Sequence, residues 1–292
     1  MPQSNLRCDA CDASVSIGYE QWHLVCCACG LERSTLNPHI NEIHSIDEIK
    51  REMALKPLRD HNFDILLKWL KGCIRDHSGF IVRKKLLDVG CAHGWFIEKA
   101  GVNFDVLGLE PDDAVASRAR QRNLPVRKGY FPEALKAGEI FDVIVFNDVL
   151  EHIPDVKNVL KECAARLSDD GVVVINAPDS RGLLYRLSKL LTKAGRIGAF
   201  HRMWQVGLPS PHLYYFDRGS MNKIALASGF RVSAERQLPS ILSGNLYERI
   251  YCAGNVSKLR SAIITGGILM LIPFLKVFRS DISVWVLAKS AA

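Results

Sequence analysis

Several features common in other protein classes are missing from this 292-residue chain. It has no uninterrupted apolar run of the roughly 20 residues that a transmembrane helix needs. The best candidate, residues 263–278, is broken by Gly266, Gly267 and Pro273. The first ten residues lack the apolar core of a signal peptide, and no internal repeat or low-complexity tract is present. These absences, with 48% hydrophobic and 24% charged residues, favour a globular enzyme located in the cytoplasm.

Acidic residues are scarce in the C-terminal third. Residues 181–292 contain 16 Lys/Arg and 4 Asp/Glu, whereas the first 50 residues carry a net charge of −4. There is no run of five basic residues and no interleaving of basic with aromatic residues, which disfavours a nucleic-acid groove. Two interpretations stay open: a solvated basic face, or a surface for phosphates or anionic lipid headgroups.

Disulfide patterning is also missing, although the chain has nine cysteines. Four of them form two CxxC pairs separated by fourteen residues: Cys8, Cys11, Cys26 and Cys29. Two such pairs can wrap one ion in a closed tetrahedral site, so we expect a structural Zn²⁺ rather than a catalytic one. Cys27 and His23 are alternative ligands but lie off the spacing. A thiolate site and otherwise scattered cysteines again indicate a reducing, cytoplasmic setting.

The chain divides into three segments. Residues 1–36 form the cysteine-rich ribbon, 37–79 a helical linker and 80–292 a larger domain. In the linker, helical spacing of apolar residues predicts a helix near 46–75 that Pro57 should divide in two. From residue 85 onward, short apolar strands alternate with helices, which predicts an α/β doubly wound parallel sheet. Ligands of such sheets bind beyond the carboxyl ends of the strands.

A glycine loop follows the first of these strands. Gly90 and Gly94 allow a tight turn and close approach of the backbone to a ligand. Glu110 ends the second strand, 22 residues after Asp88, where a carboxylate can accept hydrogen bonds from ribose hydroxyls. The G-x-G-x-x-G spacing of nicotinamide-binding folds fails, because positions 92 and 95 are Ala and Trp.

The loop resembles the first motif of class I S-adenosylmethionine-dependent methyltransferases, D-x-G-x-G-x-G, with Ala92 in the middle glycine position. Further matching segments are Leu109–Asp112, Phe141–Ile153, Gly171–Ile175, His212–Phe216, Ala227–Phe230 and Trp285–Lys289. The resemblance covers residues 80–292 and is closest to the branch that contains quinone-biosynthesis and sugar methyltransferases. It implies a mostly parallel seven-stranded sheet and S-adenosyl-L-methionine as cofactor.

The resemblance also implies roles for individual residues. Asp88 and the loop backbone from Gly90 through Cys91 to Gly94 would surround the methionine part of the cofactor. Glu110, followed by Pro111, would hold the ribose. The adenine would lie near Gly129 and Tyr130, and the methionine end of the pocket near Asn147 and Asp148.

Methyl transfer to a hydroxyl requires removal of a proton, and histidine is the usual base near neutral pH. His152 follows the fourth strand, where methyl acceptors enter, and His212 precedes the helix that starts near Arg218. Both are candidate catalytic residues, with His201 a more distant third. A structural role remains an alternative for each. Alignment alone, or a carboxylate such as Asp148 or Glu151, could also carry the step.

The two CxxC pairs, followed by Leu31, Asn37 and Pro38, resemble the zinc ribbon at the N-terminus of some methyltransferases of sugar and polysaccharide pathways. We therefore expect a small-molecule acceptor: a sugar hydroxyl of a cell-surface polysaccharide or its phosphorylated precursor. One alternative is a quinone or lipid-linked intermediate at the membrane. Another is a non-catalytic cofactor-binding module, which the intact motifs disfavour. Nucleic acid is not an expected partner, and the oligomeric state is not predicted.

Two segments of the C-terminal half could face the substrate. Residues 180–211 contain six basic residues and no acid. Their leucines at 183, 184, 187, 190 and 191 form a helical stripe, consistent with a lid, a membrane-surface helix or an ordinary packed helix. For residues 263–278 we expect buried packing or a lid. The alternative is contact with the inner face of the membrane.

Overall fold

The computed structural model describes residues 7–38, 46–74, 83–244, 246–252, 257–275 and 277–290. Its main element is a seven-stranded sheet in the order β10-β11-β8-β7-β4-β5-β6. Strands β4 to β8 run parallel to one another, whereas β11 runs antiparallel to both β8 and β10. This confirms the predicted seven-stranded doubly wound fold. The strands are β4 (Lys85–Val89), β5 (Asp105–Glu110), β6 (Val126–Lys128), β7 (Phe141–Asn147), β8 (Leu167–Pro178), β10 (Phe230–Leu238) and β11 (Ile282–Lys289).

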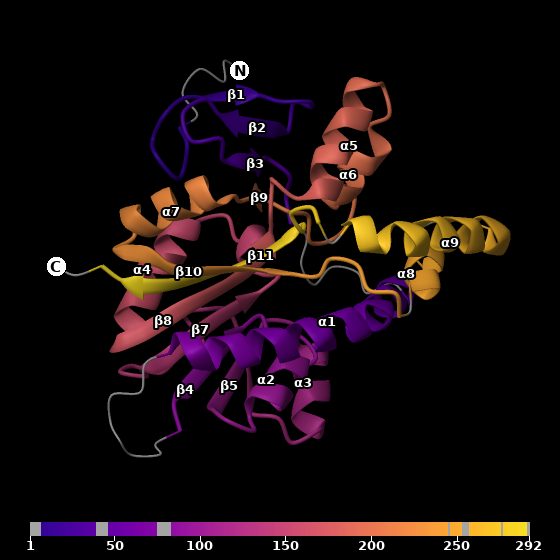
Figure 1. Cartoon of the computed structure of the whole chain (residues 1–292). Helices are drawn as coiled ribbons and strands as arrows, with labels where there is room; N and C mark the ends of the chain where they lie inside the picture. Colours follow the sequence, from indigo (N-terminus) through magenta and orange to yellow (C-terminus); the bar gives the residue numbers. More distant parts are fainter. Residues whose placement is uncertain are drawn as a thin grey trace.

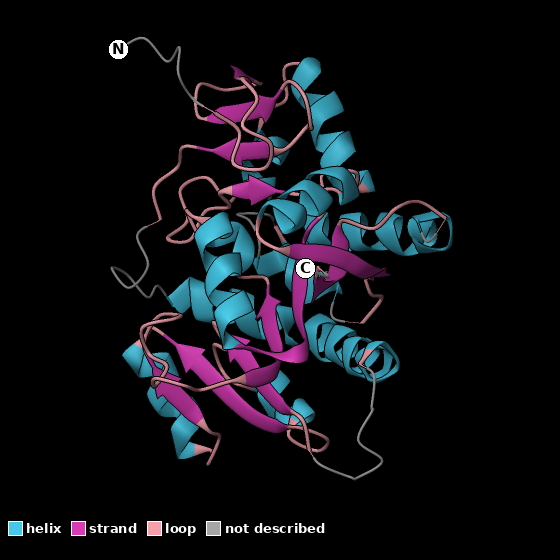
Figure 2. Cartoon of the chain, turned by 90° about the vertical axis from the view of Figure 1, so that its left-hand side faces the viewer, coloured by secondary structure: helices cyan, strands magenta, loops and turns pink. Residues whose placement is uncertain are grey.

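Helices cover both faces of this sheet, as Figures 1 and 2 show. On one face, α1 (Ile46–Cys73) and α2 (Trp95–Ala100) pack on residues such as Leu86 and Val145. On the other face, α4 (Val156–Arg166) and α7 (Arg218–Ala227) pack on Leu87 and Phe146, which follow Leu86 and Val145 in the same strands. A strand buried on both faces needs a continuous apolar run, and that is why the strands could be read from the sequence. Helix α3 (Asp113–Gln121) lies beside β6 at the sheet edge.

The expected division of the linker helix at Pro57 is wrong. Helix α1 continues through Pro57 from Ile46 to Cys73. Proline lacks the N–H that would bond to the preceding turn, which destabilises a helix locally. Downstream, Leu66 and Leu70 are fully buried against the sheet, and this tertiary packing offsets the lost hydrogen bond.

A second sheet lies above the carboxyl end of the first (Figure 1). It has the order β1-β2-β3-β9, with β1 (Val15–Ile17), β2 (His23–Cys26), β3 (Glu32–Ser34) and β9 (Tyr214–Tyr215). The first three strands come from the cysteine ribbon. The fourth comes from the larger domain and pairs antiparallel with β3, with Glu32 opposite Tyr215. The ribbon is therefore joined to the larger domain by a shared sheet, which the sequence did not reveal.

The remaining elements gather around the carboxyl ends of the parallel strands. They are the short 3-10 helix η1 (Leu150–His152), α5 (Leu183–Lys193), α6 (Gly198–Met203), α8 (Leu246–Cys252) and α9 (Lys258–Leu275). In α5 the buried side chains are Tyr185 and Ser188, whereas Leu187 and Leu190 are exposed. In α9, large apolar side chains such as Ile263 and Met270 are exposed, so the expectation of buried packing is wrong for much of that helix. Within the described residues, no helix is long and apolar enough to cross a membrane.

Candidate functional site

The loop after β4 adopts backbone conformations that its glycines permit. Gly90, Ala92 and Gly94 have φ angles of +68°, +46° and +74°. A Cβ on Gly90 would lie 2.7 Å from Val149, and one on Gly94 would lie 2.6 Å from Leu124. A side chain at either position would combine a strained backbone conformation with a close contact, so both positions favour glycine. Ala92 adopts the left-handed region although it carries a Cβ, an arrangement that costs energy and is frequent at ligand-binding sites.

Glu110 is held directly beside this loop. Its Oε2 accepts a hydrogen bond from Ala92 N and its Oε1 one from Asp112 N, both at 2.9 Å. Pro111 lies between Glu110 and Asp112, whose side chain caps α3 by accepting from Val115 N. The end of β5, the glycine loop and the start of α3 are thus connected through one carboxylate.

Asp88 lies at the centre of the site and is buried. Burial raises the pKa of this carboxyl group to about 8; a hydrogen bond from Asn147 lowers it and the charge of Glu110 raises it. The bond from Asn147 Nδ2 to Asp88 Oδ1 is 3.3 Å long. In the described part of the chain, Asn147 Oδ1 has no hydrogen-bond partner. A buried carboxyl group with a raised pKa is suited to a cationic ligand, which would favour its ionised form.

The other predicted cofactor residues lie around this centre. The Cys91 thiol packs beneath the loop against Ile97 and the backbone of Gly108, so any role in binding would fall to its backbone. Gly129 N donates to Glu110 O over 3.0 Å. A hollow of about 460 Å³ there is lined by Lys128, Gly129, Tyr130, Glu133 and Ala134. This is where the resemblance would place the adenine.

Asp148 follows β7 with a φ of +54° and donates its backbone N–H to Asn176 O. Burial raises the pKa of the Asp148 carboxyl group, and the charge of Arg59 lowers it. The Arg59 guanidinium, from α1, lies 3.8 Å from Asp148 Oδ2. Arg59 could not be predicted from the sequence, because a helical pattern does not show which of its polar positions will meet a strand end.

The two candidate bases, distant in sequence, lie side by side. The rings of His152 and His212 have centroids 4.9 Å apart. His152 Nδ1 lies 2.9 Å from Pro211 O, and His212 Nε2 lies 2.7 Å from the Gln205 side-chain amide. Leu213 N donates to Glu151 O, which ties η1 to the segment before β9. His201 does not join this cluster; it lies beside Glu20.

Glu151 is buried next to the two histidines. Burial raises the pKa of its carboxyl group well above the ordinary range, and the charge of Asp148 adds to this. Ligand atoms of Glu151, His152 and His212 all lie within 4.8 Å of one another. Two imidazoles and a carboxylate can either relay a proton or hold a divalent cation.

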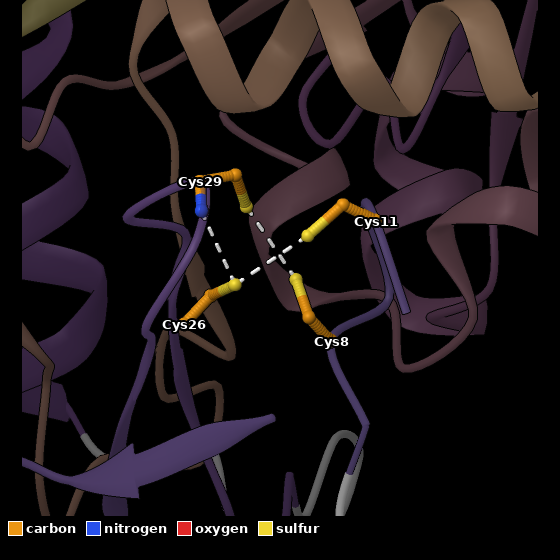
Figure 3. A group of neighbouring side chains, drawn as sticks. All are labelled: Cys8, Cys11, Cys26 and Cys29. Atoms are coloured by element: carbon orange, nitrogen blue, oxygen red, sulfur yellow. Dashed lines mark hydrogen bonds between the residues drawn. The ribbon is translucent and has the colours of Figure 1, made fainter. Parts of the chain in front are cut away.

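The four predicted zinc ligands converge at one point, as Figure 3 shows. Cys8 Sγ lies 3.5 Å from Cys29 Sγ, and Cys11 Sγ lies 3.5 Å from Cys26 Sγ. Four thiolates bound tetrahedrally at about 2.3 Å would be about 3.8 Å apart, so a small expansion admits the ion. Backbone N–H groups of Ala10, Ala28 and Cys29 point at the sulfur atoms, which stabilises thiolates. The donor set and its geometry fit zinc.

Neither alternative ligand belongs to the cluster. Cys27 is exposed, and His23 is fully buried elsewhere with its Nε2 2.9 Å from Glu32 Oε2. Glu32 also accepts hydrogen bonds from Tyr185 and Lys189 of α5, at 2.6 and 2.7 Å. Burial alone would raise the pKa of Glu32, but these partners lower it on balance.

The ribbon also reaches the histidine pair. Ser34 Oγ donates to His212 O over 2.7 Å, and Ser34 N donates to Leu213 O. The backbone of one candidate base is therefore held by the ribbon. Ser34 could not be predicted from the sequence, because only the pairing of β3 with β9 brings it to His212.

Comparison with known proteins shows the family of the chain. A family model described as a methyltransferase domain matches residues 61–235, more than half of the chain. The ubiquinone biosynthesis O-methyltransferase of Salmonella paratyphi A is 32% identical over 121 residues, covering 38% of this chain and 49% of that protein. The enzyme of the same name from Actinobacillus pleuropneumoniae is 32% identical over 112 residues, 34% and 48% of the two chains. The chain thus spans about half the length of the curated relatives it matches.

Solved structures show the same fold. A SAM-dependent methyltransferase from Archaeoglobus fulgidus aligns with a TM-score of 0.50 at 18% identity, covering 82% of this chain and 99% of that one. Another, from Thermotoga maritima, aligns with a TM-score of 0.50 at 16% identity, covering 83% and 96%. The matching family model and the fold define the class, which is that of S-adenosylmethionine-dependent methyltransferases. The chain belongs to the methyltransferase domain family.

The position of Glu110 leads to a test of cofactor binding. Glu110→Ala is expected to weaken S-adenosylmethionine binding at least about tenfold, because the charge-assisted hydrogen bonds that we expect Glu110 to make with the ribose would contribute roughly 1.5–3 kcal/mol. Calorimetric titration measures the change. Glu110→Gln, which retains the size and one acceptor oxygen, should weaken binding less. The matched control is Glu162→Gln, which makes the same change on α4, outside the glycine loop and its contacts. Unchanged affinity in Glu110→Ala would contradict the role of Glu110.

Proposed function

We propose that the carboxyl edge of the sheet binds S-adenosyl-L-methionine with its ribose on Glu110 and its methionine part beside Asp88. The cofactor carries a sulfonium and an ammonium charge, and a buried carboxyl group with raised pKa would be stabilised in its ionised form by them. The hollow at Gly129 and Tyr130 would take the adenine. Asn147 and Asp148 would border the reactive methyl group, on the side where the histidine pair lies.

We further propose that the acceptor is a phenolic hydroxyl of a quinone-type intermediate. The observation that carries this is the similarity to ubiquinone biosynthesis O-methyltransferases. The chemistry of the site supports it. The pKa of a phenol is near 10, which is much closer to the pKa of an imidazole than the pKa of an aliphatic hydroxyl is. A histidine base can therefore assist a phenol more readily than a sugar.

The sugar acceptor is the second candidate, and it rests on the N-terminal ribbon. The resemblance of this ribbon to those before sugar methyltransferases is independent of the larger domain. A non-catalytic module is disfavoured by the presence of Asp88, Glu110 and the paired histidines in one site.

The protein would contribute alignment and proton removal. The cofactor supplies the activated methyl group, so catalysis depends on placing the acceptor oxygen in line with it and excluding water. His152 or His212 would take the hydroxyl proton as the methyl group arrives. The ribbon would hold His212 in place through Ser34.

The two acceptor classes can be separated with labelled cofactor. Purified protein is expected to methylate soluble dihydroxyphenol analogues of quinone precursors and not nucleotide sugars. Mass spectrometry of the product identifies the methylated atom, and Glu110→Ala is the control for cofactor-independent label. Methylation of nucleotide sugars alone would reverse the assignment. Binding of S-adenosylmethionine without turnover on either class, or on a fractionated cell-surface extract, would favour a non-catalytic module.

A further inference from the structure

Helix α9 stands away from the rest of the molecule (Figure 1). In the chain it follows β10 and α8 and precedes β11, and it lies at the carboxyl edge of the sheet. Its main contacts are with α8, which in turn packs on α1. Among the residues that the structure describes, α8 is the main neighbour of this 18-residue helix, and several large apolar side chains of α9 are exposed. What this exposed surface carries therefore decides what α9 can do.

The helix is apolar on the side that faces away from the protein. The less exposed positions Ser261, Thr265, Ile268, Ile272 and Leu275 recur every three or four residues and form the inner stripe. Leu259, Ile263 and Met270 lie opposite this stripe at 3.6 residues per turn and are 72%, 66% and 75% exposed. Ordinary surface helices show the reverse, with polar residues outward.

More apolar residues widen this outer surface. Ile264, Leu269 and Leu271 flank the outermost three at 43%, 41% and 53% exposure, and Val277 and Phe278 continue it beyond the helix at 83% and 57%. Contiguous exposed apolar surface of this kind marks an interaction site. A single partner helix would cover only one stripe, whereas a lipid surface can cover a broad arc.

The charges next to α9 have one sign. No Asp or Glu occurs between Glu248 and Asp281, and the first turn of α9 carries the exposed Lys258 and Arg260. The C-terminal third as a whole has 16 basic and 4 acidic residues. An apolar helix with cations at its start complements an interface of acyl chains and anionic headgroups.

We propose that α9 docks this protein on an anionic lipid surface, with Leu259, Ile263 and Met270 inserted at the boundary of headgroups and acyl chains. Helix α9 lies along the surface and does not cross it, in keeping with its length and composition. Lys258 and Arg260 contact the headgroups. The carboxyl edge of the sheet, which carries the site, then lies next to the membrane. The docking surface is independent of which acceptor is methylated.

Vesicle sedimentation tests this surface in the full-length protein. The wild-type chain is expected to sediment with vesicles of phosphatidylcholine and phosphatidylglycerol, and less with phosphatidylcholine alone. Ile263→Glu with Met270→Glu should reduce the partition coefficient at least about tenfold, because each inserted side chain contributes through its buried apolar area. Lys258→Ala with Arg260→Ala should remove the preference for anionic vesicles and its salt dependence.

The matched control for each single change, Ile263→Glu or Met270→Glu, is Val102→Glu, which adds the same one charge at a 76% exposed apolar position after α2. It should sediment like the wild type. Melting temperature and S-adenosylmethionine affinity should be unchanged in all variants, because α9 lies outside the sheet. Absence of vesicle binding, or equal loss in Val102→Glu, would overturn the proposal. So would a dimer in analytical ultracentrifugation that Ile263→Glu dissociates without any vesicle binding, since α9 would then bind a second copy.

Discussion

His152→Ala is expected to lower turnover about 10²- to 10⁴-fold while S-adenosylmethionine binding stays intact, because a positioned general base contributes by that factor. His152 Nδ1 lies 2.9 Å from Pro211 O and 3.0 Å from Ser210 Oγ, and these contacts hold the ring in place beside His212. Single-turnover kinetics with labelled cofactor measures the chemical step, and calorimetry checks binding.

Three variants complete this experiment. His152→Gln can still hydrogen-bond but cannot take the proton, so it should fold normally without recovering the rate. His212→Ala should have the smaller effect if His152 is the base, and His201→Ala, outside the cluster, is the control. Near-normal turnover in His152→Ala with loss in His212→Ala would exchange the two roles. If added Mg²⁺ or Mn²⁺ raised the turnover of the wild type but not of His152→Ala or His212→Ala, Glu151, His152 and His212 would instead be assigned as ligands of a cation.

Cys26→Ser is expected to release one zinc ion per chain and to unfold the ribbon, since a structural zinc site supplies the folding energy of its module. Because the ribbon shares a sheet with the larger domain, its unfolding would also affect that domain. Strand β3 would lose its pairing with β9, and Ser34 would lose its hydrogen bond to His212 O. Turnover should therefore fall together with zinc content, while S-adenosylmethionine affinity at β4 and β5 is retained. Elemental analysis and amide hydrogen exchange measure the two effects.

Cys27→Ser is the matched control, because Cys27 is exposed and lies outside the cluster. It should keep zinc and activity. Ser34→Ala separates the metal from the contact: zinc should stay bound while turnover falls. Protein purified without chelators that contains no zinc would contradict the metal assignment. Full activity after zinc loss would contradict the link between the ribbon and His212.

The sequence was sufficient to predict the sheet and the glycine loop beside Glu110. Strands such as Phe141–Asn147 and Leu167–Pro178 are buried on both faces, so their apolar runs are visible without any tertiary information. Gly90, Gly94 and Glu110 could be recognised because a tight loop and a strand-end carboxylate depend on local backbone geometry. The four cysteines could be recognised because metal coordination imposes a fixed spacing.

Other features depended on packing that no local pattern encodes. Pro57 predicts a break, but burial of Leu66 and Leu70 keeps α1 continuous. The apolar segment in α9 predicts burial, yet whether such a helix meets the core depends on where its connections place it. The leucine stripe of α5 left open a lid, a membrane-surface helix or an ordinary packed helix, whereas in the structure Tyr185 and Ser188 are the buried side chains and Tyr185 donates to Glu32 of the ribbon.

The sequence by itself determined the doubly wound sheet, the glycine loop with its acid, and the four-thiolate cluster, because each is written in periodicity or spacing over a few residues. Only the tertiary structure decided that His152 and His212 share one site, that the ribbon joins the larger domain through β9, and that α9 turns its apolar side outward. The physical reason is that these arrangements arise from contacts between segments far apart in the chain. Their free energy depends on which surfaces come into contact, and local sequence patterns do not determine those contacts.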